Sequence, residues 1–181
     1  MLCDTEVLAT LPPREYRNGL GEMAKYAFLG VDDLADLPLD EAVAACVRCK
    51  ADVVGADERE AGRRAILNYG HTLGHALETA GRYDLRHGEA VAIGLVYAAE
   101  LARRLGRIDT ARVDHHRRVV AGYDRPLPVP PGLDPDELVA LFARDKKAVD
   151  GITFVLDGPD GVEPVRITDP QVLRDALTDV T

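Results

Sequence analysis

Residues 87–106 read HGEAVAIGLVYAAELARRLG, and the part from Ala90 to Ala99 is apolar on almost every side of a helix. Its many alanines favour the helical state and allow neighbouring helices to approach closely. A helix that is apolar all round belongs in the interior of a protein, because it has no face to present to water. We therefore predict that residues 87–106 form the central buried helix of the fold.

Length and composition restrict the class of protein. The 181 residues have room for one well-packed domain, which we place at residues 1–181. Hydrophobic residues make up 46% and charged residues 29%, as in ordinary globular proteins. The net charge of −9 argues against nucleic-acid binding, which needs a basic surface. No apolar run has the length of a membrane span and the N-terminus lacks signal-peptide features, so we expect a cytoplasmic protein without membrane contact.

The rest of the chain is predicted to be mainly helical. Gly19 and Gly21, inside the first predicted helix, suggest close packing or approach to a ligand. GITFVL and EPVRIT, separated by the turn residues DGPDG, predict a small β-hairpin over residues 152–167. Helical periodicity predicts the remaining helices at 12–29, 38–58, 65–80, 109–123, 135–147 and 169–177.

The cysteines and one pair of histidines are interpreted as structural. Cys3, Cys46 and Cys49 are an odd number without a signal peptide, which is typical of reduced thiols. Cys46 and Cys49 form a C-x-x-C pair inside a helical pattern, and no second cysteine pair completes a zinc site, so we assign them to packing. His115 and His116 lie in the charged stretch DHHRR and are predicted to face solvent.

Histidines concentrate in and after residues 67–78, LNYGHTLGHALE. His71 and His75 are four residues apart and project from the same face of a helix. This spacing suits metal ligands, but it suits substrate contacts and ordinary helix histidines equally well. The metalloprotease pattern is absent, because no Glu follows His71. His87 begins the buried helix, where a neutral metal-bound imidazole avoids the unfavourable interaction of a protonated one with the helix dipole.

Other charged residues have a function only if the fold gathers them. Glu22 and Lys25 are three positions apart in the small-residue segment GLGEMAKYA, where they can form a surface ion pair or part of a buried site. Four further cations stand near predicted helix ends: Lys50, Arg64, Lys146 and Lys147.

Four segments, in order and at the expected intervals, resemble the C-terminal domain of 3-dehydroquinate synthase. The resemblance runs from about Asp4 to the end of the chain. The segments are TLPPREYRNGLGEMAKYAFLG (10–30), CKADVVGADEREAGRRAILNYGHTLGHALE (49–78), RHGEAVAIGL (86–95) and RDKKAVDGITFVL (144–156).

The resemblance implies an activity and its cofactors. Members of this family convert 3-deoxy-D-arabino-heptulosonate 7-phosphate to 3-dehydroquinate and phosphate in the shikimate pathway, using NAD and a zinc or cobalt ion, and the full enzyme is expected to be a homodimer. The motifs imply metal ligands at Glu22, His71 and His87 and catalytic roles for Lys25 and His75. Such a ligand set, with an open position, is common in catalytic zinc sites. The implied substrate contacts are Lys50, Arg64, Asn68, His75 and one of Lys146 and Lys147.

One departure from the family pattern concerns NAD. The family's N-terminal half is a Rossmann-like domain, and this sequence has no glycine-rich strand-to-helix loop that would cradle a dinucleotide. We therefore expect NAD to be bound mainly by another domain or chain, and we expect little turnover by this chain alone. Asn68 and His75 favour dehydroquinate synthase over cyclases that make cyclitols. A related cyclase and a non-catalytic assembly module remain the alternatives.

Overall fold

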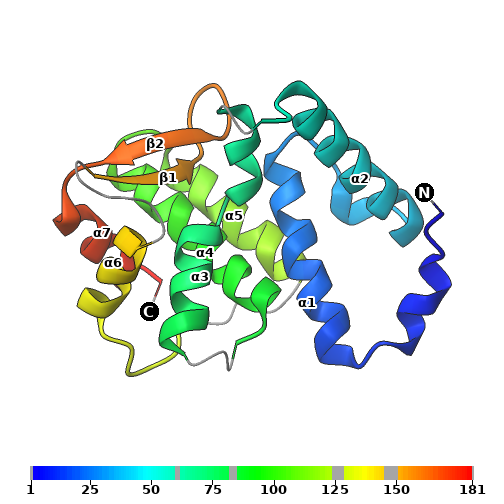
Figure 1. Cartoon of the computed structure of the whole chain (residues 1–181), viewed down its shortest axis with the longest axis horizontal. Coiled ribbons are helices and arrows are strands. Elements are labelled where there is room, and N and C mark those ends of the chain that lie inside the picture. The colour runs from blue at the N-terminus through cyan, green and yellow to red at the C-terminus, as the bar shows by residue number, and fades with distance from the viewer. Residues whose placement is uncertain (1, 60–61, 82–84, 124–128, 145–150, 181) are drawn as a thin grey trace.

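The computed structural model describes residues 2–59, 62–81, 85–123, 129–144 and 151–180. Its centre is helix α4 (His87–Arg104), and other helices pack against several of its sides (Figure 1). Almost all of α4 from Gly88 to Ala102 is buried, as its apolar sequence predicts. Removing this apolar surface from water is the main contribution to the stability of such a core.

The mainly helical fold with one β-hairpin is confirmed. The hairpin is antiparallel, with Ile152 opposite Ile167, and it lies over one end of the helices (Figure 1). Helix α6 (Pro135–Arg144) begins where predicted, and its predicted end lies outside the described residues. The other elements that follow the prediction closely are α2 (Leu39–Ala56), α5 (Thr110–Tyr123), β1 (Ile152–Leu156), β2 (Glu163–Ile167) and α7 (Pro170–Thr178).

The first helix begins where predicted, at Pro13, but its α-helical part ends earlier than predicted. The α-helix α1 covers only Pro13–Ala24, and the chain continues as a tighter 3₁₀ helix, η2 (Lys25–Phe28). Two further 3₁₀ helices were not predicted from the sequence: η1 (Thr5–Thr10) and η3 (Leu34–Asp36).

The prediction of one continuous helix over 65–80 was wrong. The segment is a 3₁₀ helix, η4 (Arg63–Asn68), followed after a sharp bend by α3 (His71–Ala80). The bend is at Gly70, whose φ of +80° is a conformation that glycine adopts readily. The bend lies directly against the backbone of α4, because a Cβ atom at Gly94 would lie 1.8 Å from the carbonyl oxygen of Gly70.

Helices α1 and α4 also touch backbone to backbone. A Cβ atom at Gly21 would lie 2.3 Å from the carbonyl oxygen of Gly88, whereas one at Gly19 would meet no atom within 4 Å. The close packing inferred from the two glycines of α1 therefore applies to Gly21 and not to Gly19.

The prediction that His116 faces solvent was wrong. Its side chain is fully buried and stacks on Phe28, with ring centroids 3.9 Å apart. Its Nε2 atom lies 2.8 Å from the Tyr69 hydroxyl and its Nδ1 atom 2.8 Å from the carbonyl oxygen of Arg112. Both ring nitrogens of His116 therefore have neutral hydrogen-bond partners. The neighbouring His115 is half-buried.

The cysteine pair fits the packing role. Cys46 is buried in a small cluster with Tyr26, Leu34 and Ala42, and all three cysteines are free thiols. Burial raises the pKa of Cys46 to about 11, with a further contribution from Cys49. A thiol with a raised pKa is a poor nucleophile and a poor metal ligand.

Among the described helices, none combines the length and the apolar composition that a membrane crossing requires.

Candidate metal centre

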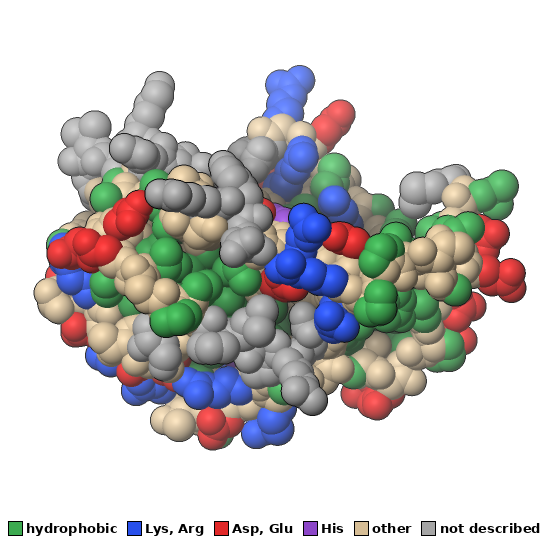
Figure 2. All heavy atoms as spheres, turned by 90° about the horizontal axis from the view of Figure 1, so that it is seen from below, with side chains coloured by type: hydrophobic (Ala, Val, Ile, Leu, Met, Phe, Trp, Pro, Cys, Tyr) green, Lys and Arg blue, Asp and Glu red, His purple; other side chains and the backbone are tan. Residues whose placement is uncertain are grey.

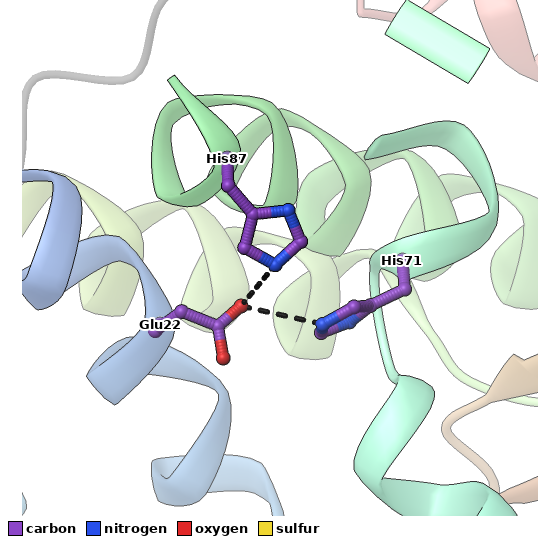
Figure 3. Close-up of side chains that lie close together, drawn as sticks. All are labelled: Glu22, His71 and His87. Atoms are coloured by element: carbon purple, nitrogen blue, oxygen red, sulfur yellow. Dashed lines mark ion pairs between the residues drawn. The ribbon is translucent and has the colours of Figure 1, made fainter. Parts of the chain in front are cut away.

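Three side chains from three different helices converge on one point. Glu22 comes from the second half of α1, His71 is the first residue of α3, and His87 is the first residue of α4. The Oε1 atom of Glu22 lies 3.3 Å from the Nε2 atom of His71 and 3.3 Å from the Nε2 atom of His87 (Figure 3). The packing of α1 and α3 against α4 thus brings these three residues together.

The backbone beside His71 sets the direction of its ring. The Nδ1 atom of His71 lies 3.0 Å from the carbonyl oxygen of Tyr69, which can only accept a hydrogen bond. Nδ1 is therefore the protonated nitrogen of the neutral ring, and the lone pair of Nε2 faces Glu22. The bend at Gly70 makes this local contact possible, because it places Tyr69 just outside the helix that His71 begins.

A second carboxylate orients His87 in the same way. The Nδ1 atom of His87 lies 3.2 Å from the Oε2 atom of Glu78 on α3. A histidine that ligates a metal usually donates its other ring N–H to a carboxylate or carbonyl, which fixes the tautomer and makes the ligating nitrogen more basic. Glu78 therefore directs the Nε2 lone pair of His87 toward Glu22.

The two oxygens of Glu22 have different surroundings. Oε2 accepts a hydrogen bond of 2.8 Å from Lys25, a side chain that is itself buried. Oε1 is buried and has no hydrogen-bond partner within the described part of the chain. Burial raises the pKa of Glu22, but its hydrogen-bonding and positively charged surroundings, the Lys25 ammonium group among them, lower the pKa by more, to about 2. The carboxylate is thus ionised at neutral pH, and its orphaned oxygen faces two imidazole nitrogens.

This donor set fits a divalent metal ion. One anionic oxygen and two neutral imidazole nitrogens are the ligands that zinc and cobalt accept. The three donor atoms lie close enough to share one ion. Without a cation or a proton between them, a carboxylate oxygen and two nitrogen lone pairs would repel one another. A divalent metal ion held by the three side chains would therefore be the partner that the Oε1 atom of Glu22 lacks.

His75 lies beside this cluster and is exposed. Its ring centroid is 5.5 Å from that of His71 and 5.8 Å from that of His87. His75, Glu78 and His87 are also close enough to share an ion, but the contact of Glu78 with His87 is already explained by its orienting role. On the face seen in Figure 2, Lys and Arg side chains gather next to a histidine.

The remaining predicted substrate contacts are more dispersed. Lys50 is exposed on α2, and Asn68 is half-buried at the end of η4. Arg64, on η4, donates through Nη1 to the carbonyl oxygen of Glu58, and its backbone N–H donates to the carboxylate of Asp57. The prediction that one of Lys146 and Lys147 contacts substrate concerns residues outside the described part of the chain.

Sequence reasoning missed the residues that support the cluster. Glu78 was overlooked, although its place three residues after His75 puts it on the same face of the helix. Asn18 and Glu89 were also overlooked, and both contact the first turn of α4. No local pattern identifies the contacts of Glu78 and Asn18, because their partners belong to another helix. Glu89 could have been recognised, because a glutamate three residues after the N-cap is the position of a capping box.

A comparison with protein families identifies the domain. Residues 19–148 match the model of the 3-dehydroquinate synthase C-terminal domain. The chain belongs to this family. Glu22, His71, His75 and His87 all lie within the matched residues.

Similar proteins from bacteria carry two different names. A protein of Amycolatopsis mediterranei, provisionally named aminodehydroquinate synthase, is 52% identical over 98% of this chain and 50% of its own length. The 3-dehydroquinate synthase of Thermosynechococcus vestitus is 42% identical over 86% of this chain and 47% of its own length. The chain thus spans about half the length of the curated relatives it matches.

Solved structures of sugar-phosphate cyclases share the fold of this domain. A 2-deoxy-scyllo-inosose synthase in complex with carbaglucose-6-phosphate, NAD⁺ and Co²⁺ superimposes with a TM-score of 0.80 at 25% identity, over 98% of this chain and 55% of that chain. A 2-epi-5-epi-valiolone synthase from Streptomyces hygroscopicus with NAD⁺ and Zn²⁺ bound gives a TM-score of 0.72 at 25% identity, covering 98% of this chain and 54% of that chain.

Proposed function

We propose that this chain is the metal- and substrate-binding part of a sugar-phosphate cyclase of the 3-dehydroquinate synthase type. The observation that carries the proposal is the buried, unpartnered Oε1 atom of Glu22, which faces the Nε2 atoms of His71 and His87. Each imidazole has its Nδ1 atom engaged elsewhere, with Tyr69 or Glu78. The two Nε2 lone pairs are therefore available to a cation.

The metal in this proposal is zinc or cobalt. When bound, it would supply a Lewis acid that holds substrate hydroxyl groups and polarises the carbon to be oxidised. Around it, Lys25 keeps Glu22 ionised through the 2.8 Å hydrogen bond to Oε2. The exposed imidazole of His75 is placed to donate a hydrogen bond or a proton to an anionic group of the substrate.

The substrate in this proposal carries a phosphate and a carboxylate. Converging cations suit such a ligand, and a planar guanidinium can bind a carboxylate through two hydrogen bonds. We assign this task to Lys50, Arg64, Asn68, His75 and one of Lys146 and Lys147. Arg64 is compatible with it, because its guanidinium contacts a backbone carbonyl and not a carboxylate among the described residues.

NAD in this proposal is bound mainly by a nucleotide-binding domain. The relatives are about twice as long as this chain, and the chemistry begins with hydride transfer to NAD. No glycine-rich loop that would cradle the dinucleotide occurs among the 181 residues of this chain. We therefore expect turnover only when such a domain is supplied, covalently or as a separate chain.

Two substrates are candidates within this proposal. The family match supports the heptulosonate 7-phosphate that gives 3-dehydroquinate. The 52% identity with the Amycolatopsis protein, against 42% with the Thermosynechococcus enzyme, favours an amino-substituted relative of that substrate. The metal centre is the same in both cases, so the difference lies in contacts to the substituents of the ring.

Metal content tests the centre, and ligand binding tests the substrate. The purified chain should bind one equivalent of zinc, and His71→Ala and His87→Ala should each lower the affinity strongly. Stoichiometric zinc in a variant that lacks both histidines would refute the centre. Calorimetric titration of the zinc-loaded chain with the heptulosonate 7-phosphate and with its amino analogue should then show which one binds more tightly. Binding of neither compound would contradict the substrate assignment.

A further inference from the structure

Helix α1 contacts the start of α4 at three positions on one face, each four residues apart. Arg14 forms two hydrogen bonds, of 2.9 and 2.8 Å, with the carboxylate of Glu89. Asn18 contacts Gly88, and the next residue on this face is the candidate ligand Glu22. Residues four apart project from the same side of a helix. One face of α1 therefore holds the start of α4 and also carries the candidate ligand Glu22.

The N-cap side chain of α4 cannot accept a hydrogen bond from the first turn of the helix. The N-cap residue is Arg86, and a guanidinium group has only donors, so it cannot accept a hydrogen bond from the unpaired N–H groups of a helix start. The side chain of Asn18 takes this role from another helix, because its Oδ1 atom accepts a hydrogen bond of 2.6 Å from the N–H of Gly88. The backbone N–H of Arg86 is satisfied by the Oε2 atom of Glu89, at 2.9 Å.

Close backbone packing makes this contact possible. A Cβ atom at Gly88 would lie 1.8 Å from the carbonyl oxygen of Asn18. Only glycine at this position allows α1 to approach so closely that a side chain as short as asparagine reaches the backbone of α4. The separation of the two helices at this point is therefore fixed by contact between their backbones.

His87 lies between the two residues whose N–H groups are held. We propose that Asn18 is a positioning residue that sets the direction of His87 toward Glu22 by capping the first turn of α4. Glu22 is one turn further along the helix that carries Asn18, so the same contact fixes both candidate ligands relative to each other. This inference rests on the proposed metal centre.

Three variants of the full chain test the inference. Asn18→Ala removes the acceptor and should fold, because alanine is a better helix former than asparagine. Asn18→Asp keeps an acceptor of the same shape. Tyr97→Phe is the matched control. It removes another hydrogen bond of α4 between a side chain and the backbone, which the Tyr97 hydroxyl donates to the carbonyl oxygen of Leu173. Tyr97 does not belong to the cluster of candidate ligands.

Zinc affinity, measured by competition with a chromogenic chelator, and the visible spectrum of the cobalt form are the readouts. Asn18→Ala should lower zinc affinity by about tenfold, as expected for a partner that orients a ligand, and should change the cobalt spectrum. Asn18→Asp should restore both. Tyr97→Phe should lower the midpoint of thermal unfolding and leave zinc affinity unchanged.

The outcomes separate this inference from the proposed function. If the wild-type chain binds zinc and Asn18→Ala binds it equally well with the same cobalt spectrum, the positioning role is refuted and the metal centre stands. If Tyr97→Phe loses as much affinity as Asn18→Ala, the effect reflects general stability and the positioning role is likewise refuted. If the wild-type chain binds no zinc, the metal centre and the inference both fail.

Discussion

The Nδ1 atom of His87 lies 3.2 Å from the Oε2 atom of Glu78, and the two residues belong to consecutive helices. The contact depends on the packing of α3 along α4, where a Cβ atom at Gly74 would be in van der Waals contact, at 3.4 Å, with the backbone of Ala90. The packing of these two helices therefore brings Glu78 to the Nδ1 atom of His87 and leaves the Nε2 atom facing Glu22.

Removing Glu78 should weaken metal binding. Without the carboxylate, the ring of His87 can turn and change tautomer, and loss of such a partner typically costs roughly 10- to 100-fold in affinity. Glu78→Ala should therefore show this decrease in a chelator competition assay. Glu137→Ala, at an exposed position in the first turn of α6, is the control and should bind zinc like the wild type. Equal affinities in the two variants would contradict the orienting role of Glu78.

Replacing Lys25 should destabilise the metal-free protein more than the zinc-bound protein. Lys25→Met removes the hydrogen-bonded cation of Glu22, whose side chain is 33% exposed. The expected loss of unfolding free energy is therefore about 1–2 kcal/mol, at the lower end for charged hydrogen bonds. Bound zinc neutralises the same carboxylate and should reduce the loss. Urea unfolding with and without zinc measures both values, and an equal loss in the two conditions would disprove the prediction.

Two glycines in α1 should respond oppositely to alanine. Gly19→Ala meets no atom within 4 Å and should stabilise the protein by about 0.5–1 kcal/mol through helix propensity. Gly21→Ala places a Cβ atom 2.3 Å from the carbonyl oxygen of Gly88, so the helices must separate, at a cost of about 1–3 kcal/mol. The free energies of urea unfolding of both variants check this. A stable Gly21→Ala variant with normal zinc affinity would show that the contact is not needed.

The buried His116 should make stability depend on pH. Burial lowers the pKa of His116, and this outweighs the Arg112 carbonyl and the Asp157 carboxylate, which raise it. The unfolded chain, with a histidine pKa of about 6.5, therefore takes up this proton first as pH falls. The stabilising contribution is complete above about pH 6.5 and decreases below it by up to about 1.4 kcal/mol per pH unit.

A variant isolates this contribution from those of the other titrating groups. His116→Gln cannot titrate, so its unfolding free energy should decrease less steeply than that of the wild type as pH falls below about 6.5. Guanidinium unfolding at a series of pH values measures both slopes. Parallel slopes would mean that His116 takes up its proton over the same pH range in the folded and unfolded states.

The apolar pattern of the sequence alone determined α4 and the hairpin. In both, the local signal agrees with the packing, since Ala90 to Ala99 can only be buried and DGPDG can only turn. The motifs also identified Glu22, His71 and His87 as candidates, because the resemblance relates each of them to a known segment. Only the tertiary structure decided the bend at Gly70, the burial of His116 and the capping of α4 by Asn18. Each of these features depends on how closely two helix backbones approach, or on which side chain faces a distant segment. Neither can be read from the few neighbouring residues of one helical turn, because the contacting segments are far apart in the sequence.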